Sequence, residues 1–266
     1  MKMIPGLVKI APLVSSYELP QSSFPQNGKR SQRYRIFSLA YSELTPQGTI
    51  LLEREPVSEE QCRLKIQVNR PAVSGFRHWT QAELLCRNDA LSSPLSWTVS
   101  TKVAPHELAP AYLQSGMSKS ATLEDGYIRY QCGPHHFREP VDRPVTCKYN
   151  LLDAVQRLPF EKTQRLEFLC LDEFDQVGGL QRLQYRQTET VGLGNGPERL
   201  HSYQQTGFGQ VPALYWTDSN GRLLFVVSGI EVLVLEEENG RHIVSRKDAD
   251  VFRDAVKLRR SEGSAA

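Results

Sequence analysis

Hydrophobic and polar residues alternate along much of the chain, and this alternation predicts a series of β-strands. The clearest case is residues 62–69, where Cys62, Leu64, Ile66 and Val68 face one way and Arg63, Lys65 and Gln67 face the other. Residues 183–190 repeat the one-sided pattern, with polar side chains along one face. Further strands are expected at residues 34–44, 49–54, 79–86, 95–103, 126–132 and 199–206.

Residues 203–235 predict three or four more consecutive strands, separated by residues that favour sharp reversals. Asn220–Gly221 and Asn239–Gly240 are strong hairpin signals, because both residue types tolerate the positive φ that tight turns require. Glu238 and Arg241 are expected to pair across the second turn. Residues 223–227 and 232–235 are apolar on both faces, which predicts central strands. A turn is also expected at residues 46–48, Pro-Gln-Gly.

These strands predict a mainly β fold, a large curved antiparallel meander that resembles a half-barrel, with one or two packed helices. One helix is expected at residues 151–158, capped by Asn150, and a second at residues 248–259, capped by Ser245. The chain then divides into an N-terminal arm or linker at 1–32, a single β domain at 33–245, and a C-terminal helix and basic tail at 246–266.

Composition narrows the function classes. The net charge of +2 gives no field that would recruit nucleic acid, and no apolar run is long enough for a transmembrane segment. The five cysteines are odd in number and widely spaced, without a CxxC pair, so they do not predict a disulfide framework. No motif for a cofactor is present, and no cofactor is predicted.

Two groups of residues have the chemistry of a reactive site. Cys132, His135, His136 and Cys147 offer zinc ligands, but they lack the paired short spacings of zinc sites, and adjacent histidines on a strand point to opposite faces. No metal site is therefore assigned. The acidic residues Asp172, Glu173 and Asp175 follow an apolar run and are more simply solvated at a strand end. With His135 and His136, Asp172 or Glu173 form the basis of an alternative, hydrolase-like hypothesis.

Four aromatic residues on expected strands are candidates for lining an apolar pocket on a curved sheet: Trp97, Tyr185, Trp216 and Phe225. The alternative, favoured by the general behaviour of aromatic residues, is that they fill the core. Replacing Trp216 with alanine separates the two, because loss of binding alone indicates a pocket and loss of folding indicates a core.

Three segments carry a family resemblance: residues 93–97, residues 151–158 and residues 207–227. Together they resemble a family of uncharacterised bacterial proteins, whose strand meander ends in a Val-Pro-x-x-Tyr-Trp, Asp-x-x-Gly-Arg-Leu unit. More distantly, residues 33–236 resemble the half-barrel folds of periplasmic lipoprotein carriers. The resemblance implies a curved sheet around a helix, a hydrophobic cavity, and a location in the periplasm or cell envelope. Its motifs are structural and imply no catalytic residues.

The sequence thus favours a non-catalytic binding protein over an enzyme. We expect it to hold an apolar or amphipathic, lipid-like ligand, or a protein partner, on the concave face of the sheet. A structural interaction domain with a filled core remains a further alternative.

Overall fold

A computed structural model describes residues 6–40, 43–71, 76–105, 115–160 and 165–243. Its strands form one sheet with the order β8-β7-β6-β5-β4-β3-β2-β1-β15-β14-β13-β12-β11-β10-β9, and β16 pairs with β15 beside this path. Every pairing is antiparallel except that of β9 with β10. These two strands are parallel, and α2 lies in the connection between them. The mainly β, curved meander expected from the sequence is confirmed.

The strands are β1 (Arg30–Ala40), β2 (Glu43–Pro56), β3 (Gln61–Pro71), β4 (Phe76–Arg87), β5 (Pro94–Pro105), β6 (Ser115–Glu124), β7 (Tyr127–Cys132), β8 (His135–Pro140), β9 (Val145–Cys147), β10 (Leu166–Asp172), β11 (Gln176–Leu193), β12 (Gly196–Gly207), β13 (Ala213–Thr217), β14 (Leu223–Ser228), β15 (Glu231–Glu238) and β16 (Arg241–His242). The helices are α1 (Ala11–Ser16) and α2 (Lys148–Ala154), with short 3-10 turns at Val8–Ile10 and Val155–Arg157.

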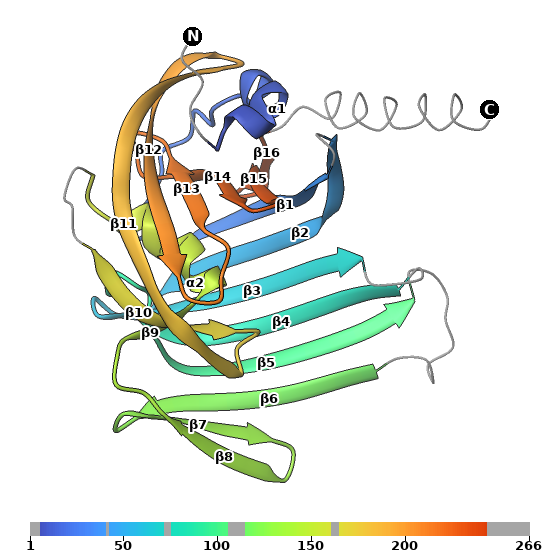
Figure 1. Ribbon diagram of the computed structural model, residues 1–266, viewed down its shortest axis with the longest axis vertical. Coiled ribbons are helices and arrows are strands. Elements are labelled where there is room, and N and C mark those ends of the chain that lie inside the picture. The colour runs from blue at the N-terminus through green and yellow to red at the C-terminus, as the bar shows by residue number, and fades with distance from the viewer. Residues whose placement is uncertain (1–5, 41–42, 72–75, 106–114, 161–164, 244–266) are drawn as a thin grey trace.

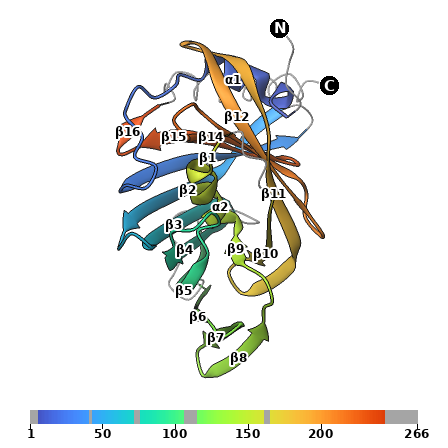
Figure 2. The same ribbon diagram turned by 90° about the vertical axis from the view of Figure 1, so that its left-hand side faces the viewer.

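The sheet curves until its two halves face each other. In Figure 1, β1 to β8 descend through the body, and the long strands β11 and β12 stand across them. Figure 2 shows α2 between these two walls, on the concave side of the sheet. Six residues of α2, from Tyr149 to Ala154, are buried. The helix therefore fills part of the space that the curved sheet encloses.

The predicted hairpins are confirmed. Asn220–Gly221 lies between β13 and β14, and Asn239–Gly240 lies between β15 and β16, with Glu238 opposite Arg241 in the register. Strands β14 and β15 are central, and most of their side chains are buried. Strand β3 alternates as predicted, with its even-numbered side chains from Cys62 to Val68 buried.

The prediction of a turn at residues 46–48 is wrong, because β2 continues through these residues. The register with β1 shifts between Ile36 and Phe37 at this point, and Gly48 has a φ of +131°. A side chain at Gly48 would collide with the Asn69 carbonyl, 1.9 Å from an added Cβ. Glycine therefore serves a bulge within a strand here and does not end the strand.

The helix predicted at residues 151–158 begins three residues earlier, so Asn150 is not its cap. Cys147 occupies the N-cap position, and its sulfur accepts a hydrogen bond from the Asn150 backbone N–H. Asn150 lies wholly buried inside the helix, and its amide donates to the Ser92 carbonyl at 2.7 Å. The second predicted helix, at 248–259 with Ser245 as its cap, lies outside the described residues.

The N-terminal segment packs more closely than an arm or linker would. Its residues Leu7, Ile10, Leu13, Val14 and Tyr17 are buried in the core. The backbone of this segment also meets the β11–β12 hairpin, where the Gly194 N–H donates to the Tyr17 carbonyl at 2.8 Å. Strand β1 then begins at Arg30, before the expected boundary at residue 33.

Candidate functional site

The four aromatic residues predicted to line a pocket form one cross-strand pair and two separate positions. Trp216 and Phe225 are cross-strand partners on β13 and β14, and both are fully buried. Trp97 is buried on β5, where its indole N–H donates to the Phe174 carbonyl at 2.9 Å. Tyr185 on β11 is half-buried and meets the Tyr203 ring edge-on. Their part in ligand binding stays a prediction.

The residues of the hydrolase hypothesis lie on different elements. His135 and His136 are on β8, an edge strand of the sheet, whereas Asp172 and Glu173 lie where β10 turns into β11. Cys147 is buried at the start of α2. Within the described part of the chain, no group of three or more His, Cys, Asp or Glu residues has the geometry of a metal site.

A buried ionic cluster fixes α2 inside the curve. The Asp153 carboxylate accepts hydrogen bonds from Arg54 at 2.8 Å, Arg157 at 3.2 Å and the Ser92 hydroxyl at 2.7 Å, and Arg30 also contacts it. Burial alone would raise the pKa of Asp153, but the three guanidinium groups lower it below its ordinary value. The carboxylate is therefore ionised and holds β1, β2 and the helix together.

The Asp-x-x-Gly-Arg-Leu unit of the resemblance forms a turn in this chain. Asp218 accepts hydrogen bonds from the backbone N–H groups of Asn220 and Arg222, which forms the β13–β14 turn. The buried Arg222 guanidinium pairs with Asp218 and with Glu238, both at 3.1 Å. Glu238 thus lies opposite Arg241 in the register, as predicted, but forms its ion pair with Arg222.

The turn between β10 and β11 covers another part of the concave face. Phe174 is buried and stacks on Tyr149 of α2, with ring centroids 5.4 Å apart. Glu173 and Phe174 both have positive φ values, 47° and 67°, and the turn is held to the opposite wall by Trp97 and Lys119. The deep half of the concave face is therefore occupied by the protein's own side chains.

An open pocket of about 290 Å³ remains at the mouth of the curve, where β1, β3 and the β14–β15 turn meet. We call it the mouth pocket. Its apolar lining residues are Ile36, Phe37, Pro71 and Ile230, and its polar lining residues are Ser38, Gln47, Arg70 and Glu231. This is a mixed lining, with apolar side chains around one ion pair.

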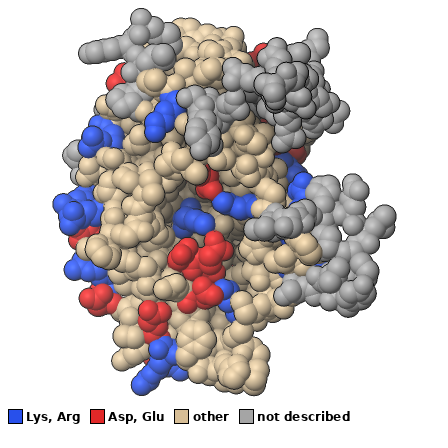
Figure 3. All heavy atoms as spheres, turned by 45° about the vertical axis from the view of Figure 1, so that its right-hand side comes forward, with Lys and Arg blue, Asp and Glu red and all other residues tan. Residues whose placement is uncertain are grey.

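That ion pair joins Arg70 to Glu231 at 2.7 Å, with side-chain exposures of 30% and 36%. Burial alone would lower the pKa of Arg70, but Glu231 raises it overall, so the guanidinium stays charged. A second pair, Lys148 with Glu173 at 3.2 Å, lies close enough to Arg70 to interact electrostatically. Figure 3 shows basic and acidic side chains gathered around a hollow near the centre of this face.

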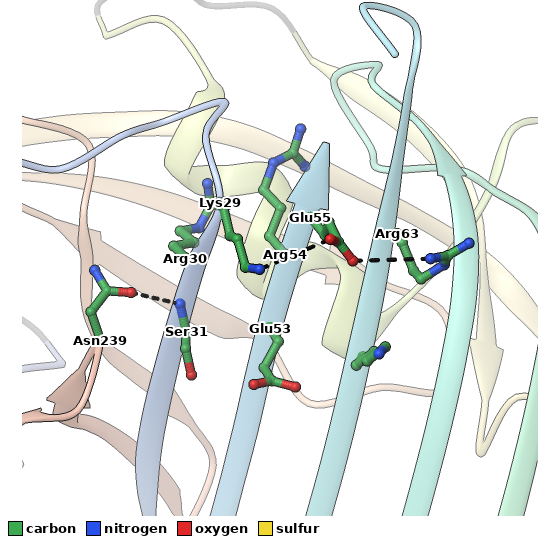
Figure 4. Close-up of a pocket in the computed structure, with 9 residues that line it drawn as sticks. Lys29, Arg30, Ser31, Glu53, Arg54, Glu55, Arg63 and Asn239 are labelled. Atoms are coloured by element: carbon green, nitrogen blue, oxygen red, sulfur yellow. Dashed lines mark hydrogen bonds and ion pairs between the residues drawn. The ribbon is translucent and has the colours of Figure 1, made fainter. Parts of the chain in front are cut away.

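A second pocket, of about 210 Å³, lies at the other end of β1, β2 and β3. Its ionic side chains form a line across the strands, with Lys29 and Arg63 both paired to Glu55, at 3.9 and 4.0 Å (Figure 4). Arg54 points inward to Asp153, so by strand alternation Glu53 and Glu55 point outward. All nine residues that line this pocket are polar or charged.

Sequence reasoning missed the mouth pocket because its residues come from distant segments. Arg70 and Glu231 are separated by 161 positions. One signal was available: Arg70 continues the inward-facing series of β3 after Val68, so a charged residue follows four apolar ones on the concave face. The partner in β15 was not readable from the local pattern.

Comparisons with known proteins identify a shared fold. No family model matches the chain, and no curated protein sequence matches it. The structure is similar to the crystal structure of a β-barrel-like protein from Brucella abortus, described as a Domain of Unknown Function, DUF1849. The TM-score is 0.50 at 10% sequence identity, over 80% of this chain and 97% of that one. At this identity the similarity establishes a distant β-barrel-like fold and does not establish a function.

Proposed function

We propose that the protein is a non-catalytic binding protein that holds an amphipathic, lipid-like ligand in the mouth pocket. The observation that supports this proposal is the lining itself, in which Phe37, Pro71 and Ile230 share one pocket with the Arg70–Glu231 ion pair. Apolar walls with a small number of placed polar groups are typical of small-molecule sites. Trp97, Trp216 and Phe225 are not among the residues that line this pocket.

The ion pair favours a zwitterionic head group. A purely anionic head would bind Arg70 only by displacing Glu231, which would leave a half-buried carboxylate without its partner. A zwitterion satisfies both groups, its anion at Arg70 and its cation at Glu231. An arginine guanidinium also suits the planar, paired hydrogen bonds that phosphate and carboxylate oxygens accept.

Isothermal titration with three amphiphiles of equal chain length tests this function. A zwitterionic phosphocholine, an anionic sulfate and a neutral maltoside would each be added below its micelle concentration. We expect the phosphocholine to bind most tightly, by about tenfold or more, which corresponds to about 1.4 kcal/mol. Equal affinity for all three would show apolar contact without head-group recognition, and absence of binding would refute the proposal.

A protein-interaction domain is the second candidate, and the filled deep half of the concave face favours it. The Phe174 ring on Tyr149 and the buried α2 leave little enclosed space there. If none of the three amphiphiles binds, this candidate replaces the first.

A further inference from the structure

We propose that two neighbouring turns, β12–β13 and β14–β15, form a rim that rests on the surface of a lipid bilayer. We call residues 207–212 and 228–230 the lipid rim. The proposal goes beyond the binding of a soluble amphiphile and is tested separately from it.

The first observation is the exposure of three large apolar side chains at the tips of these turns. Phe208 is 84% exposed, Ile230 is 66% exposed and Val211 is 61% exposed. Among the large hydrophobic residues that the structure describes, these three side chains are the most exposed. Single exposed apolar residues are ordinary on a protein surface, but a group of them at one end of the molecule marks an interaction site.

The second observation is that the two turns lie against each other. The Ser228 hydroxyl donates to the Val211 carbonyl at 3.5 Å, and a Cβ placed on Gly229 would lie 3.1 Å from the Val211 side chain. The first turn is also held to β11, because the Phe208 backbone N–H donates to the Leu180 carbonyl at 3.2 Å. The three exposed side chains are therefore carried on one connected edge of the sheet.

The third observation is the absence of charged residues within the two turns themselves. The sequence has no Asp, Glu, Lys or Arg from residue 204 to residue 217, or from residue 223 to residue 230. The nearest acidic residue, Glu231, is neutralised by its ion pair with Arg70. Turn tips without charge offer no ion pair to an acidic or basic protein partner, whereas they can enter the boundary between lipid head groups and chains without removing water from an ion.

The lipid rim lies beside the mouth pocket. Ile230 belongs both to the lipid rim and to the lining of the mouth pocket. A bilayer under the rim would therefore lie next to the opening through which an amphiphile reaches the Arg70–Glu231 pair. The geometry suits extraction or delivery of a lipid-like molecule at a bilayer surface.

A tryptophan placed at the tip reports contact with lipid. F208W would be mixed with unilamellar vesicles of equal parts zwitterionic and anionic phospholipid, with V57W as the control. Val57 is 49% exposed in the β2–β3 turn, at the opposite end of the strands, and leaves the same three native tryptophans as background. We expect a blue shift and quenching by brominated lipid for F208W alone. No shift, or the same shift in both variants, would overturn the proposal.

Because a new tryptophan can itself favour lipid, a second measurement uses the native side chains. Vesicle co-sedimentation of the wild type would be compared with that of the triple variant F208S/V211S/I230S and of the control V8S/V57S. We expect the triple variant to bind at least about tenfold more weakly, and the control to bind as the wild type does. Failure of the wild type to sediment with vesicles, or equal binding by all three proteins, would overturn the proposal.

The outcome is distinguishable from a failure of the proposed function. The variant R70Q/E231Q alters the mouth pocket without touching an exposed apolar tip, so it should lose soluble phosphocholine but still sediment with vesicles. Loss of vesicle binding in this variant would show that the pocket, and not the rim, is what contacts lipid.

Discussion

Arg54 and Asp153 form an ion pair of 2.8 Å in which neither side chain is exposed to solvent. Two further guanidinium groups, those of Arg30 and Arg157, share the same carboxylate. This arrangement joins the inner helix to the first two strands of the sheet.

Removing the shared carboxylate should strongly destabilise the protein. D153N leaves three buried guanidinium groups around a neutral amide, and loss of one partner of a buried pair costs about 3–5 kcal/mol. Urea denaturation followed by circular dichroism measures the change.

Glu167 provides the matched control, because it also contacts three arginines, Arg143, Arg165 and Arg182, but on the surface. E167Q should change the stability little, and added salt should screen that small effect while leaving the D153N effect in place. Equal losses in the two variants would contradict the importance of burial.

The same carboxylate makes a specific contribution to acid stability. Its pKa in the folded protein lies below the ordinary value of 3.8. The stabilisation is therefore fully present above that value and is lost as the pH falls through the folded-state pKa. We expect the difference in unfolding free energy between wild type and D153N to be constant from about pH 7 to about pH 5 and to narrow below about pH 4. A difference in unfolding free energy that grows as the pH falls would contradict this prediction.

Trp216 distinguishes a core residue from a pocket residue. The side chain is 1% exposed and sits beside Phe225, so W216A should leave a cavity and cost about 3–5 kcal/mol of stability. A thermal or urea unfolding curve gives the answer. A variant that keeps wild-type stability but loses ligand would instead support the original prediction that Trp216 lines a pocket.

Arg70 should show the opposite behaviour. The Arg70–Glu231 pair is partly exposed, so R70Q should cost no more than about 1 kcal/mol in stability. It should nevertheless weaken phosphocholine binding by about tenfold, because the anionic part of the head group then loses the guanidinium group that it would bind. The control is R63Q, which breaks the outer-face pair with Glu83 at 3.0 Å. Similar effects of R70Q and R63Q on binding would exclude the mouth pocket as the site.

Much of the fold was readable because strands and hairpins are local. The alternation from Cys62 to Val68 and the Asn220–Gly221 turn depend on neighbouring residues, and both predictions hold. The turn predicted at residues 46–48 failed because a proline and a glycine also fit a bulge, and the Asn69 carbonyl that requires Gly48 comes from the next strand.

The site was less readable because tertiary contacts create it. Arg30 and Arg54 look like ordinary surface arginines in the sequence, yet Asp153 makes their burial possible. The mouth pocket likewise needs the β14–β15 turn to reach the end of β3, a contact that no local pattern encodes.

The most direct test of the account is to locate a bound amphiphile. A phosphocholine with a photoreactive diazirine in its chain would be crosslinked to the wild-type protein, with and without an excess of the unlabelled compound, and the labelled peptides would be identified by mass spectrometry. We predict that label appears on the segments that carry Phe37, Pro71 and Ile230 and disappears under competition. Label confined to other segments, or label that competition does not reduce, would contradict a binding site at the mouth of the concave face.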